Sequence, residues 1–400
     1  MAQAGFDPKG KDGGLDRALT LAPLVLYGMG VIVGAGIYVA LGAVMQRAAA
    51  AAPLSFFLAG ASAALTGLCY AELASRFPEA SGAAGFVRHA FRSDIAGGIA
   101  TLAITAATAV AAASIAHGAA VYLREIAAID PRLITTIVIA VNTGIAIYGV
   151  RASVGLAAIV GAVEILGLVA AVAAGLYLAP DYRIEALLPS GAEGWLGVLD
   201  GAFIAYFAFI GFETLVNMAE EVKNPTRTVP AGIVGAVAAS TALYVLVAVS
   251  VILAERASEN PLLSLFEGKG ALAFSLIGSI SIANGVLVEI VMLSRLFYGM
   301  ARAGLLPQSM GRVESFTRTP VIATLAAGAI VLATALLAPF ERLLTAANAI
   351  MLMIFLIVDL SLLLVKRRQP TPRPAFCIPS WIPPIAIGGT LILLLAGARG

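Results

Sequence analysis

Long, uninterrupted apolar segments limit the fold of this sequence more than any other feature. A helix needs about 20 apolar residues to cross the hydrocarbon core of a bilayer. Eleven segments meet or approach this length, at residues 19–46, 52–76, 95–123, 133–150, 154–179, 196–221, 229–254, 270–301, 320–338, 343–365 and 380–398. These segments are continuously apolar, whereas the strands of a membrane barrel alternate apolar and polar residues. We therefore predict an all-α polytopic membrane protein with about eleven spans.

Charge supports this prediction and indicates an orientation. Only 12% of the residues are charged, against about 25% in a soluble domain. If the polar tail at residues 1–18 is cytoplasmic, the inner segments hold sixteen Lys and Arg residues and the outer ones eight. Basic residues concentrate in cytoplasmic loops, so we expect an inner-membrane protein with a cytoplasmic N-terminus. The tail lacks the apolar stretch of a signal peptide, and a net charge of +2 gives no reason to expect a nucleic-acid partner.

The first apolar segment contains a glycine-rich stretch that we expect to interrupt its helix. Gly28, Gly30, Gly34 and Gly36 lie within nine residues, and each weakens a helix by about 1 kcal/mol relative to alanine. Freed backbone is tolerated at membrane depth only where it lines a cavity. Unwinding at Val33–Gly36 would present amides to a carboxylate and carbonyls to an ammonium group. The alternative is that these glycines only allow close helix packing.

The sixth segment has a matching candidate at Tyr206–Glu213, which contains Gly211 and an ionisable Glu213. Many transporters have interrupted helices at corresponding places in two inverted repeats. We therefore predict a first repeat at residues 19–179, a second at 196–365 and a peripheral helix at 380–398.

Four carboxylates fall inside apparent spans, and each costs about 2.5–3.5 kcal/mol at the bilayer centre if it is ionised. Glu164 is a candidate carrier of a coupling proton or a ligand of a cation; alternatively, it is a neutral side chain bonded to a backbone carbonyl. Glu213 is either a proton-sensitive gate that can pair with an ammonium group, or a cap on the second half-helix. We expect structural roles for Glu289, next to the cavity or a neighbouring helix, and for Asp359, paired with Lys366.

Charged residues near the inner surface, the histidines and the cysteines give further predictions. Six charged residues lie near the inner surface, and ion pairs among them are expected to close an intracellular gate; the alternative is that these charges are simply solvated. The residues are Glu72, Arg76, Glu220, Glu221, Lys223 and Arg227. His117 is expected to be a buried neutral side chain. With two histidines and two cysteines, a metal site or disulfide framework is not expected.

Four motifs together resemble the amino acid–polyamine–organocation permeases. They are the glycine stretch Gly28–Tyr38, the segment Leu68–Gly82, the pair Phe207–Glu213 and Glu220–Pro225, and Ser294–Arg302 followed by Gly304–Pro307. The resemblance extends from about residue 19 to about residue 395.

The resemblance implies a LeuT-type fold of five plus five inverted helices and transport by alternating access. It implies that the substrate carboxylate and amine bind at Ile32, Val33, Gly34, Ala35 and Gly36. The amine and side chain would contact Phe207, Ala208, Phe209, Ile210 and Gly211, with Phe207 packing on the substrate and Glu213 taking part in proton-dependent gating.

Two features depart from the family pattern. Family members usually have twelve spans, one more than we predict here. The common Ala-Arg-Asp-Gly sequence after the eighth span reads Ala301-Arg302-Ala303-Gly304, which removes an expected intracellular carboxylate.

We therefore predict a secondary active amino acid transporter, either proton-coupled or an exchanger, that lies in a lipid bilayer and binds a small-molecule substrate. The expected coupling ion is the proton, acting through Glu164 and Glu213, and no cofactor is expected. A polyamine or small-amine antiporter is the alternative within this class, and a non-transporting receptor or scaffold lies outside it. We do not expect an enzyme, because the sequence contains no nucleophile–base pair, zinc motif or P-loop.

Overall fold

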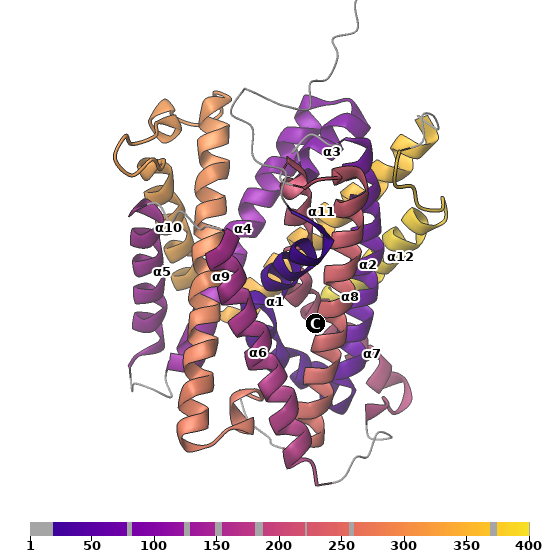
Figure 1. Cartoon of the computed structure of the whole chain (residues 1–400), viewed down its shortest axis with the longest axis vertical. Coiled ribbons are helices and arrows are strands. Elements are labelled where there is room, and N and C mark those ends of the chain that lie inside the picture. The colour runs from indigo at the N-terminus through magenta and orange to yellow at the C-terminus, as the bar shows by residue number, and fades with distance from the viewer. Residues whose placement is uncertain are drawn as a thin grey trace, which may run out of the picture.

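A computed structural model describes residues 19–77, 82–123, 129–148, 154–180, 187–220, 222–255, 260–368 and 374–399 (Figure 1). The predicted cytoplasmic tail at residues 1–18 therefore lies outside the described part. Within that part the protein is an all-α polytopic membrane protein, as predicted. Eight stretches are long and apolar enough to cross a membrane, the first of them containing two helices, and two further apolar helices are shorter.

Each of the eleven predicted segments corresponds to an observed helix. The helices are α1 (Leu21–Ala48), α2 (Ala52–Arg76), α4 (Asp94–Leu123), α5 (Pro131–Tyr148), α6 (Val154–Leu178), α7 (Gly191–Ala205), α8 (Pro225–Leu253), α9 (Gly268–Arg302), α10 (Val321–Leu337), α11 (Phe340–Arg368) and α12 (Ile382–Gly397). Short 3₁₀ segments are η1 (Ala49–Ala51), η3 (Tyr206–Phe209), η4 (Phe212–Glu220), η5 (Leu263–Leu265) and η6 (Gln308–Gly311). The sixth segment is the one that changes type along its length, from α7 through η3 to η4.

One helix was not predicted. Helix α3 (Gly82–Phe91) is a ten-residue amphipathic helix between α2 and α4. Phe86 and Val87 are buried, whereas Arg88, His89 and Phe91 are exposed. A segment this short and mixed cannot cross a bilayer, which is why a search for long apolar runs passes over it.

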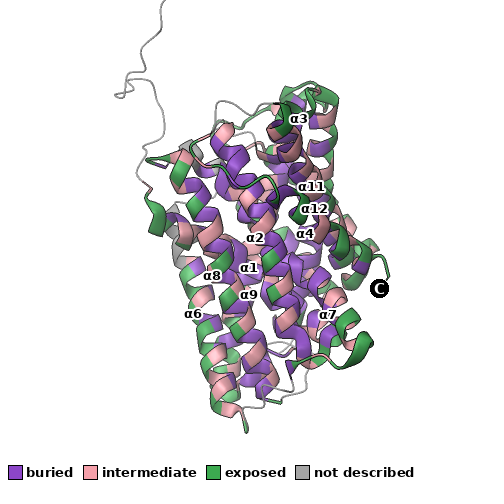
Figure 2. Ribbon diagram, turned by 90° about the vertical axis from the view of Figure 1, so that its right-hand side faces the viewer, coloured by how far each residue is buried: buried purple, intermediate pink, exposed green. Residues whose placement is uncertain are grey.

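Helix α1 lies in the middle of the bundle and is surrounded by the helices that matter for the site (Figure 1). It packs against α6, α7, α8 and α9, and α2 packs against α7 and α8. Helices α4, α5, α9 and α10 pack on one another on one side of α1, and α11 packs on α2, α3, α4 and α12. Buried residues concentrate inside the bundle and exposed ones on its outer faces (Figure 2). Many of the exposed side chains are large and apolar, such as Leu102, Leu166 and Leu395, which suits contact with lipid.

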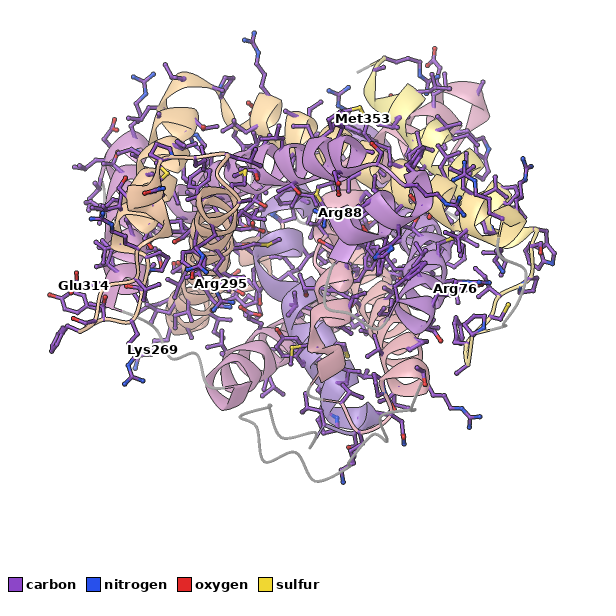
Figure 3. All side chains as sticks on the ribbon, turned by 90° about the horizontal axis from the view of Figure 1, so that it is seen from above. Arg76, Arg88, Lys269, Arg295, Glu314 and Met353 are labelled. Atoms are coloured by element: carbon purple, nitrogen blue, oxygen red, sulfur yellow. The ribbon has the colours of Figure 1, made fainter. Side chains whose placement is uncertain are left out.

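Charged side chains lie mainly at the margins. Viewed from above, Lys269 and Glu314 project from the edge of the bundle (Figure 3).

A backbone hydrogen bond joins the residues just before α1 to those just after η4: the amide of Lys223 donates to the carbonyl of Leu19 at 3.2 Å. The division into inverted repeats at 19–179 and 196–365 stays a prediction.

Candidate functional site

Helix α1 is interrupted at a single residue. Gly34 has φ 0° and ψ −144°, whereas the residues on either side continue as helix. The predicted unwinding over Val33–Gly36 is therefore too long, because the helix resumes directly after Gly34. A Cβ atom added at Gly34 would meet no atom within 4 Å. The interruption therefore faces open space, although Gly34 itself is buried.

The other glycines of this stretch allow close helix packing. The two interpretations of the glycines therefore both hold: Gly34 interrupts the helix, and the others allow neighbouring helices to approach. A Cβ at Gly28 would lie 2.7 Å from Cδ2 of Leu215, and one at Gly30 would lie 3.3 Å from Cα of Gly161 on α6. A Cβ at Gly36 would lie 2.7 Å from Cα of Ala208. The glycine spacing thus brings α1 against α6 and against the sixth span.

The sixth span is interrupted over a longer stretch. Helix α7 ends at Ala205 and continues as η3, Ile210 is extended with ψ 134°, and Gly211 has φ +122° before η4 begins. A side chain rarely adopts this positive φ. A Cβ at Gly211 would in addition lie 2.9 Å from Cγ1 of Val31. Glycine is therefore required at this turn, both for its backbone angle and for its contact with α1.

The two interruptions are neighbours, and a side chain from a third helix joins them. The hydroxyl of Tyr244 on α8 lies 2.8 Å from the carbonyl oxygen of Ile32 and 2.9 Å from that of Ala208. A hydroxyl group has one proton to donate, so it satisfies only one of these carbonyls at a time. Because the helix is irregular at both places, these carbonyls are available to a polar group.

Sequence reasoning did not identify Tyr244 as part of the site. The signal was present: a tyrosine in the middle of an apolar span usually needs a partner for its hydroxyl group. Its partners lie 212 and 36 residues away in the sequence, and only the packing of α8 on α1 reveals them.

The predicted binding residues differ in accessibility. Ile32, Val33, Gly34 and Ala35 are buried and Gly36 is half-buried. In the sixth span Phe207, Ala208, Phe209 and Gly211 are buried, and Ile210 is half-buried. Gly36 and Ile210, which retain exposed surface, are the members that a small molecule could reach first.

Glu213 has the geometry of a cap. Its carboxylate accepts a hydrogen bond of 2.9 Å from the amide of Gly211, and Thr214 donates its hydroxyl to the carbonyl of Gly211 at 2.7 Å. Glu213 thereby occupies a backbone amide that the interruption would otherwise leave free. A carboxylate on a ligand would have to compete with it for this amide.

Glu164 is the carboxylate with the least compensation. It is 1% exposed, and neither of its carboxylate oxygens has a hydrogen-bond partner within the described residues. Ser281 and Asn284 of α9 lie near it, but without the geometry of a hydrogen bond to either oxygen. Its backbone carbonyl accepts a bond of 3.2 Å from the hydroxyl of Tyr38, which belongs to α1. Glu164 thus lies beside the interrupted helix, and the predicted alternative, a carboxyl group bonded to a backbone carbonyl, is not observed.

The remaining carboxylates differ in their surroundings. Glu289 is half-buried on α9 and lies near Glu213. Asp359 is fully buried on α11, where Thr66 donates a 3.1 Å bond to it. The predicted pairing of Asp359 with Lys366 is wrong. Lys366 instead forms an ion pair with Glu72 at 2.7 Å.

Glu72 is the centre of the predicted cluster of ion pairs. It is fully buried and binds Arg76 at 2.7 Å, Lys366 at 2.7 Å and the amide of Ile378 at 2.8 Å. Helices α2 and α11 and the segment before α12 are therefore joined by one carboxylate. Of the other predicted members, Lys223 is exposed, whereas Glu221 and the side chain of Glu220 lie outside the described part of the chain.

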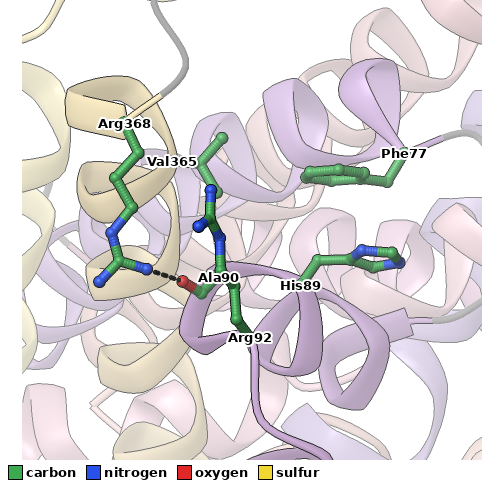
Figure 4. A pocket seen from close by; sticks show the side chains of 6 residues that line it. All are labelled: Phe77, His89, Ala90, Arg92, Val365 and Arg368. Atoms are coloured by element: carbon green, nitrogen blue, oxygen red, sulfur yellow. Dashed lines mark hydrogen bonds between the residues drawn. The ribbon is translucent and has the colours of Figure 1, made fainter.

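Two smaller features lie near the ends of the bundle. A hollow between α3 and the end of α11 contains Arg92 and Arg368 beside His89, which stacks on Phe77 with ring centres 4.8 Å apart (Figure 4). His117 is half-buried, less than predicted, and its Nε2 donates to the carbonyl of Ala335 at 2.9 Å. Among the described residues no group of three or more His, Cys, Asp or Glu side chains could hold a metal ion.

The sequence is similar to those of known transporters. A family model described as amino acid permease matches residues 19–398. The chloroplastic cationic amino acid transporter 9 of Arabidopsis thaliana is 31% identical over 331 residues, which cover 75% of this chain and 58% of that protein. The vacuolar cationic amino acid transporter 4 of the same plant is 31% identical over 395 residues, covering 90% and 65%.

A bacterial relative is matched over more of its length. The methylthioribose transporter of Bacillus subtilis is 28% identical over 415 residues, which cover 94% of this chain and 87% of that protein. By contrast, the chain spans less than two thirds of the length of the two plant transporters.

Proposed function

Because the chain belongs to the amino acid permease family of the amino acid–polyamine–organocation superfamily, we propose that this multi-pass membrane protein is a secondary active transporter working by alternating access. Its substrate is an amino acid or a related amine. Neither the family nor its named relatives are enzymes, and we extend that to this chain.

The observation that carries the proposal is the contact between the two interrupted spans. Gly34 faces open space, Ala208 packs on Gly36, and Tyr244 bonds to a carbonyl in each interruption. Irregular backbone at membrane depth is tolerated where it lines a cavity, and here it occurs twice at one place. The substrate carboxylate would bind amides near Gly34, and the ammonium group would bind the carbonyls of Ile32 and Ala208, replacing the Tyr244 hydroxyl on one of them.

The side chain of the substrate would then lie toward Phe207 and Ile210. The named plant relatives are transporters of cationic amino acids, and a cationic side chain would be attracted to Glu213 and Glu289, which lie near one another. The bacterial relative is a methylthioribose transporter, so a neutral substrate is the second candidate. Two further candidates are a polyamine antiporter and a receptor that binds a ligand without transporting it, and the experiment below distinguishes them.

We propose that the coupling ion is the proton and that Glu164 carries it, because its two carboxylate oxygens are buried without partners beside α1. The protein would lie in the inner, cytoplasmic membrane with its N-terminus inside. This orientation rests on the distribution of basic residues along the sequence.

Thermal stability of the purified protein tests the substrate class. Arginine, lysine, alanine, a diamine and methylthioribose would each be added separately, because a ligand at 100 times its Kd stabilises the folded state by about 2.7 kcal/mol. We expect a shift with arginine or lysine, followed by uptake of the same compound into liposomes. Stabilisation without uptake would favour a receptor, and no stabilisation by any amine or amino acid would contradict the proposed substrate class.

A further inference from the structure

The seam between α2 and α11 contains a buried polar cluster that the proposed transport cycle does not yet use. Its centre is Asp359 on α11, which is 0% exposed. Thr66 on α2 donates a 3.1 Å hydrogen bond to its Oδ2 atom. The other carboxylate oxygen, Oδ1, has no partner among the described residues. One of its two oxygens is therefore unsatisfied in the interior of a membrane protein, where ionisable groups are costly and are usually functional.

Two phenol groups next to Asp359 are also unsatisfied. The hydroxyls of Tyr70 on α2 and Tyr206 on η3 are buried and have no hydrogen-bond partner in the described part of the chain. Both lie close enough to Asp359 to interact with it electrostatically. The thiol of Cys69 lies beside the carboxylate as well. One carboxylate oxygen and two phenol oxygens in this part of the seam thus lack a hydrogen-bond partner among the described residues.

Aromatic rings enclose this cluster and connect it to the sixth span. Phe355 lies one helical turn before Asp359 on the same face of α11. Its ring centre is 5.8 Å from that of Tyr70, 5.8 Å from that of Tyr206 and 5.2 Å from that of Phe212. Tyr206 begins η3 and Phe212 begins η4. Any movement of α11 away from α2 must therefore disturb the interruption next to Gly211.

The charges around Asp359 do not neutralise it. Lys366, two turns further along α11, is bonded to Glu72 at 2.7 Å and to the carbonyl of Ile378 at 2.6 Å. The titratable groups that interact with Asp359 from α2 and from the sixth span are Cys69, Tyr70 and Tyr206, none of which is a cation. Glu72 and Glu213 lie near these three groups and are acidic as well.

The other helices packed on α11 direct their titratable groups elsewhere. On α4, Asp94 pairs with Arg88 and His117 bonds to the carbonyl of Ala335. On α7, Asp200 pairs with Arg399. On α3, His89 stacks on Phe77, and α12 contains no titratable side chain.

We propose that Asp359 is a proton-binding site, separate from Glu164, that holds a proton while α11 is packed on α2 and releases it when this seam opens to water. The proposal rests on the proposed transport function only for its role in the cycle. A neutral carboxyl group fits the closed seam, because one of its oxygens accepts from Thr66 and the proton on the other removes a buried charge that no cation compensates. An ionised carboxylate in the same place would be a buried charge without a cation, which the protein avoids by admitting water.

This site links proton release to the substrate site. Opening the seam moves Phe355 relative to Tyr206 and Phe212, and these residues flank the interruption that contains Ile210 and Gly211. The released proton passes to water in the opened seam. Proton binding at Asp359 then favours the closed seam and the conformation that Ile210 and Gly211 adopt in this structure.

Cys69 is a native reporter of the seam. It is a free, buried thiol beside Asp359, and the second cysteine, Cys377, is exposed. In a Cys377→Ala background, Cys69 is the single remaining cysteine. Its rate of reaction with a small membrane-permeant maleimide would be measured on the detergent-purified full chain, between about pH 5.5 and pH 8.5. Asp359→Asn in the same background supplies the matched comparison, because asparagine keeps the shape of the side chain and cannot ionise. The substitution also removes a carboxylate beside the Cys69 thiol, which favours the reactive thiolate and so acts against the difference expected here.

We expect equal labelling of the two proteins at the acidic end and labelling about tenfold faster at the basic end when Asp359 is present. Thr66→Val removes a donor that favours the ionised carboxylate, so the pH at which labelling accelerates should rise. This variant keeps the test informative if Asp359→Asn does not fold. Glu164→Gln in the same background should retain the pH dependence. Labelling that is the same at every pH with and without Asp359, or that responds to Glu164 instead, overturns the proposal.

Transport in liposomes separates this proposal from the proposed function. Asp359→Asn should lose accumulation driven by a pH gradient and keep counterflow exchange, which needs no net proton movement. If the unmodified chain transports none of the tested substrates, the proposed function fails, while the labelling of Cys69 still decides whether Asp359 controls the seam. If Asp359→Asn accumulates substrate as well as the unmodified chain does, the role of this proton in coupling is refuted.

Discussion

At the scale of single residues, the two glycines that interrupt the spans act in different ways. Gly211 has a positive φ and a close contact with Val31, so its lack of a side chain is a requirement of the fold. Gly34 has open space in front of it, so its lack of a side chain instead leaves room at the site. Gly211 thus contributes to the stability of the fold, whereas Gly34 contributes to the function of the site.

Gly211→Ala should therefore destabilise the protein. A side chain at φ +122° and a Cβ clash with Val31 predict a loss of about 1–3 kcal/mol, seen as a lower melting temperature in detergent. Gly98→Ala on α4 is the control, because a Cβ there meets no atom within 4 Å and alanine favours the helix. Equal melting temperatures for the two variants would contradict the assignment of Gly211.

Tyr244→Phe removes the hydroxyl group shared by the two interruptions and keeps the ring. We expect a loss of stability of about 0.5–1.5 kcal/mol together with a lower rate of uptake, because the two broken spans are no longer held to α8. Tyr148→Phe on α5, whose side chain is 80% exposed, should change neither quantity. A Tyr244→Phe protein with unaltered uptake would show that the bridge is only structural.

Glu164→Gln tests the proposed proton carrier with almost no change of shape. The amide cannot exchange a proton, so uptake driven by a pH gradient should be abolished and substrate exchange should persist. Uptake and exchange would be measured in proteoliposomes with equal amounts of incorporated protein. Unchanged proton-driven uptake would remove Glu164 from the coupling mechanism.

At the scale of elements, Glu72 joins α2, α11 and the segment before α12 through a buried ion pair with two cations. Removing one partner of a buried ion pair leaves the other charges uncompensated, which typically costs about 3–5 kcal/mol. Breaking this junction should therefore loosen the end of the seam between α2 and α11 where Lys366 lies.

Glu72→Gln should lower the melting temperature strongly, and the double variant Glu72→Gln with Lys366→Met should recover part of the loss, because it removes one of the stranded cations. Asp94→Asn is the control. It breaks the exposed pair with Arg88 and should cost at most about 1 kcal/mol. A double variant no more stable than the single one would contradict the direct pairing of Glu72 with Lys366.

At the scale of the whole molecule, the arrangement of spans predicts on which side of the membrane each connection lies. Cys377 is exposed and lies between α11 and α12, a connection that the distribution of basic residues assigns to the cytoplasm. A membrane-impermeant maleimide should therefore label Cys377 in inverted membrane vesicles and leave it unmodified in intact cells. Cys377→Ala supplies the control for labelling at the buried Cys69. Labelling from the outside of intact cells would reverse the proposed orientation.

The positions of the spans could be predicted from the sequence because they depend on length and polarity alone. Each of the eleven predicted segments corresponds to helical structure whose ends lie within five residues of the prediction, when the sixth is counted from the start of α7 to the end of η4. The glycine stretch and Gly211 indicated where two helices are interrupted, since a weak helix former acts on its own backbone. Helix α3 was missed because ten amphipathic residues carry no comparable signal.

Only the tertiary structure decided which side chains meet. Lys366 lies two helical turns beyond Asp359, where a side chain reaching toward the interface could have paired with it, but the rotation of α11 brings Lys366 to Glu72, almost 300 residues earlier in the chain. Tyr244 reaches two carbonyls in other helices, and Thr66 reaches Asp359, for the same reason. Backbone continuity and hydrophobicity are properties of a local segment, so the sequence by itself determined the spans and their interruptions. The partners of a buried polar atom depend on how distant helices rotate and pack, which no local segment encodes.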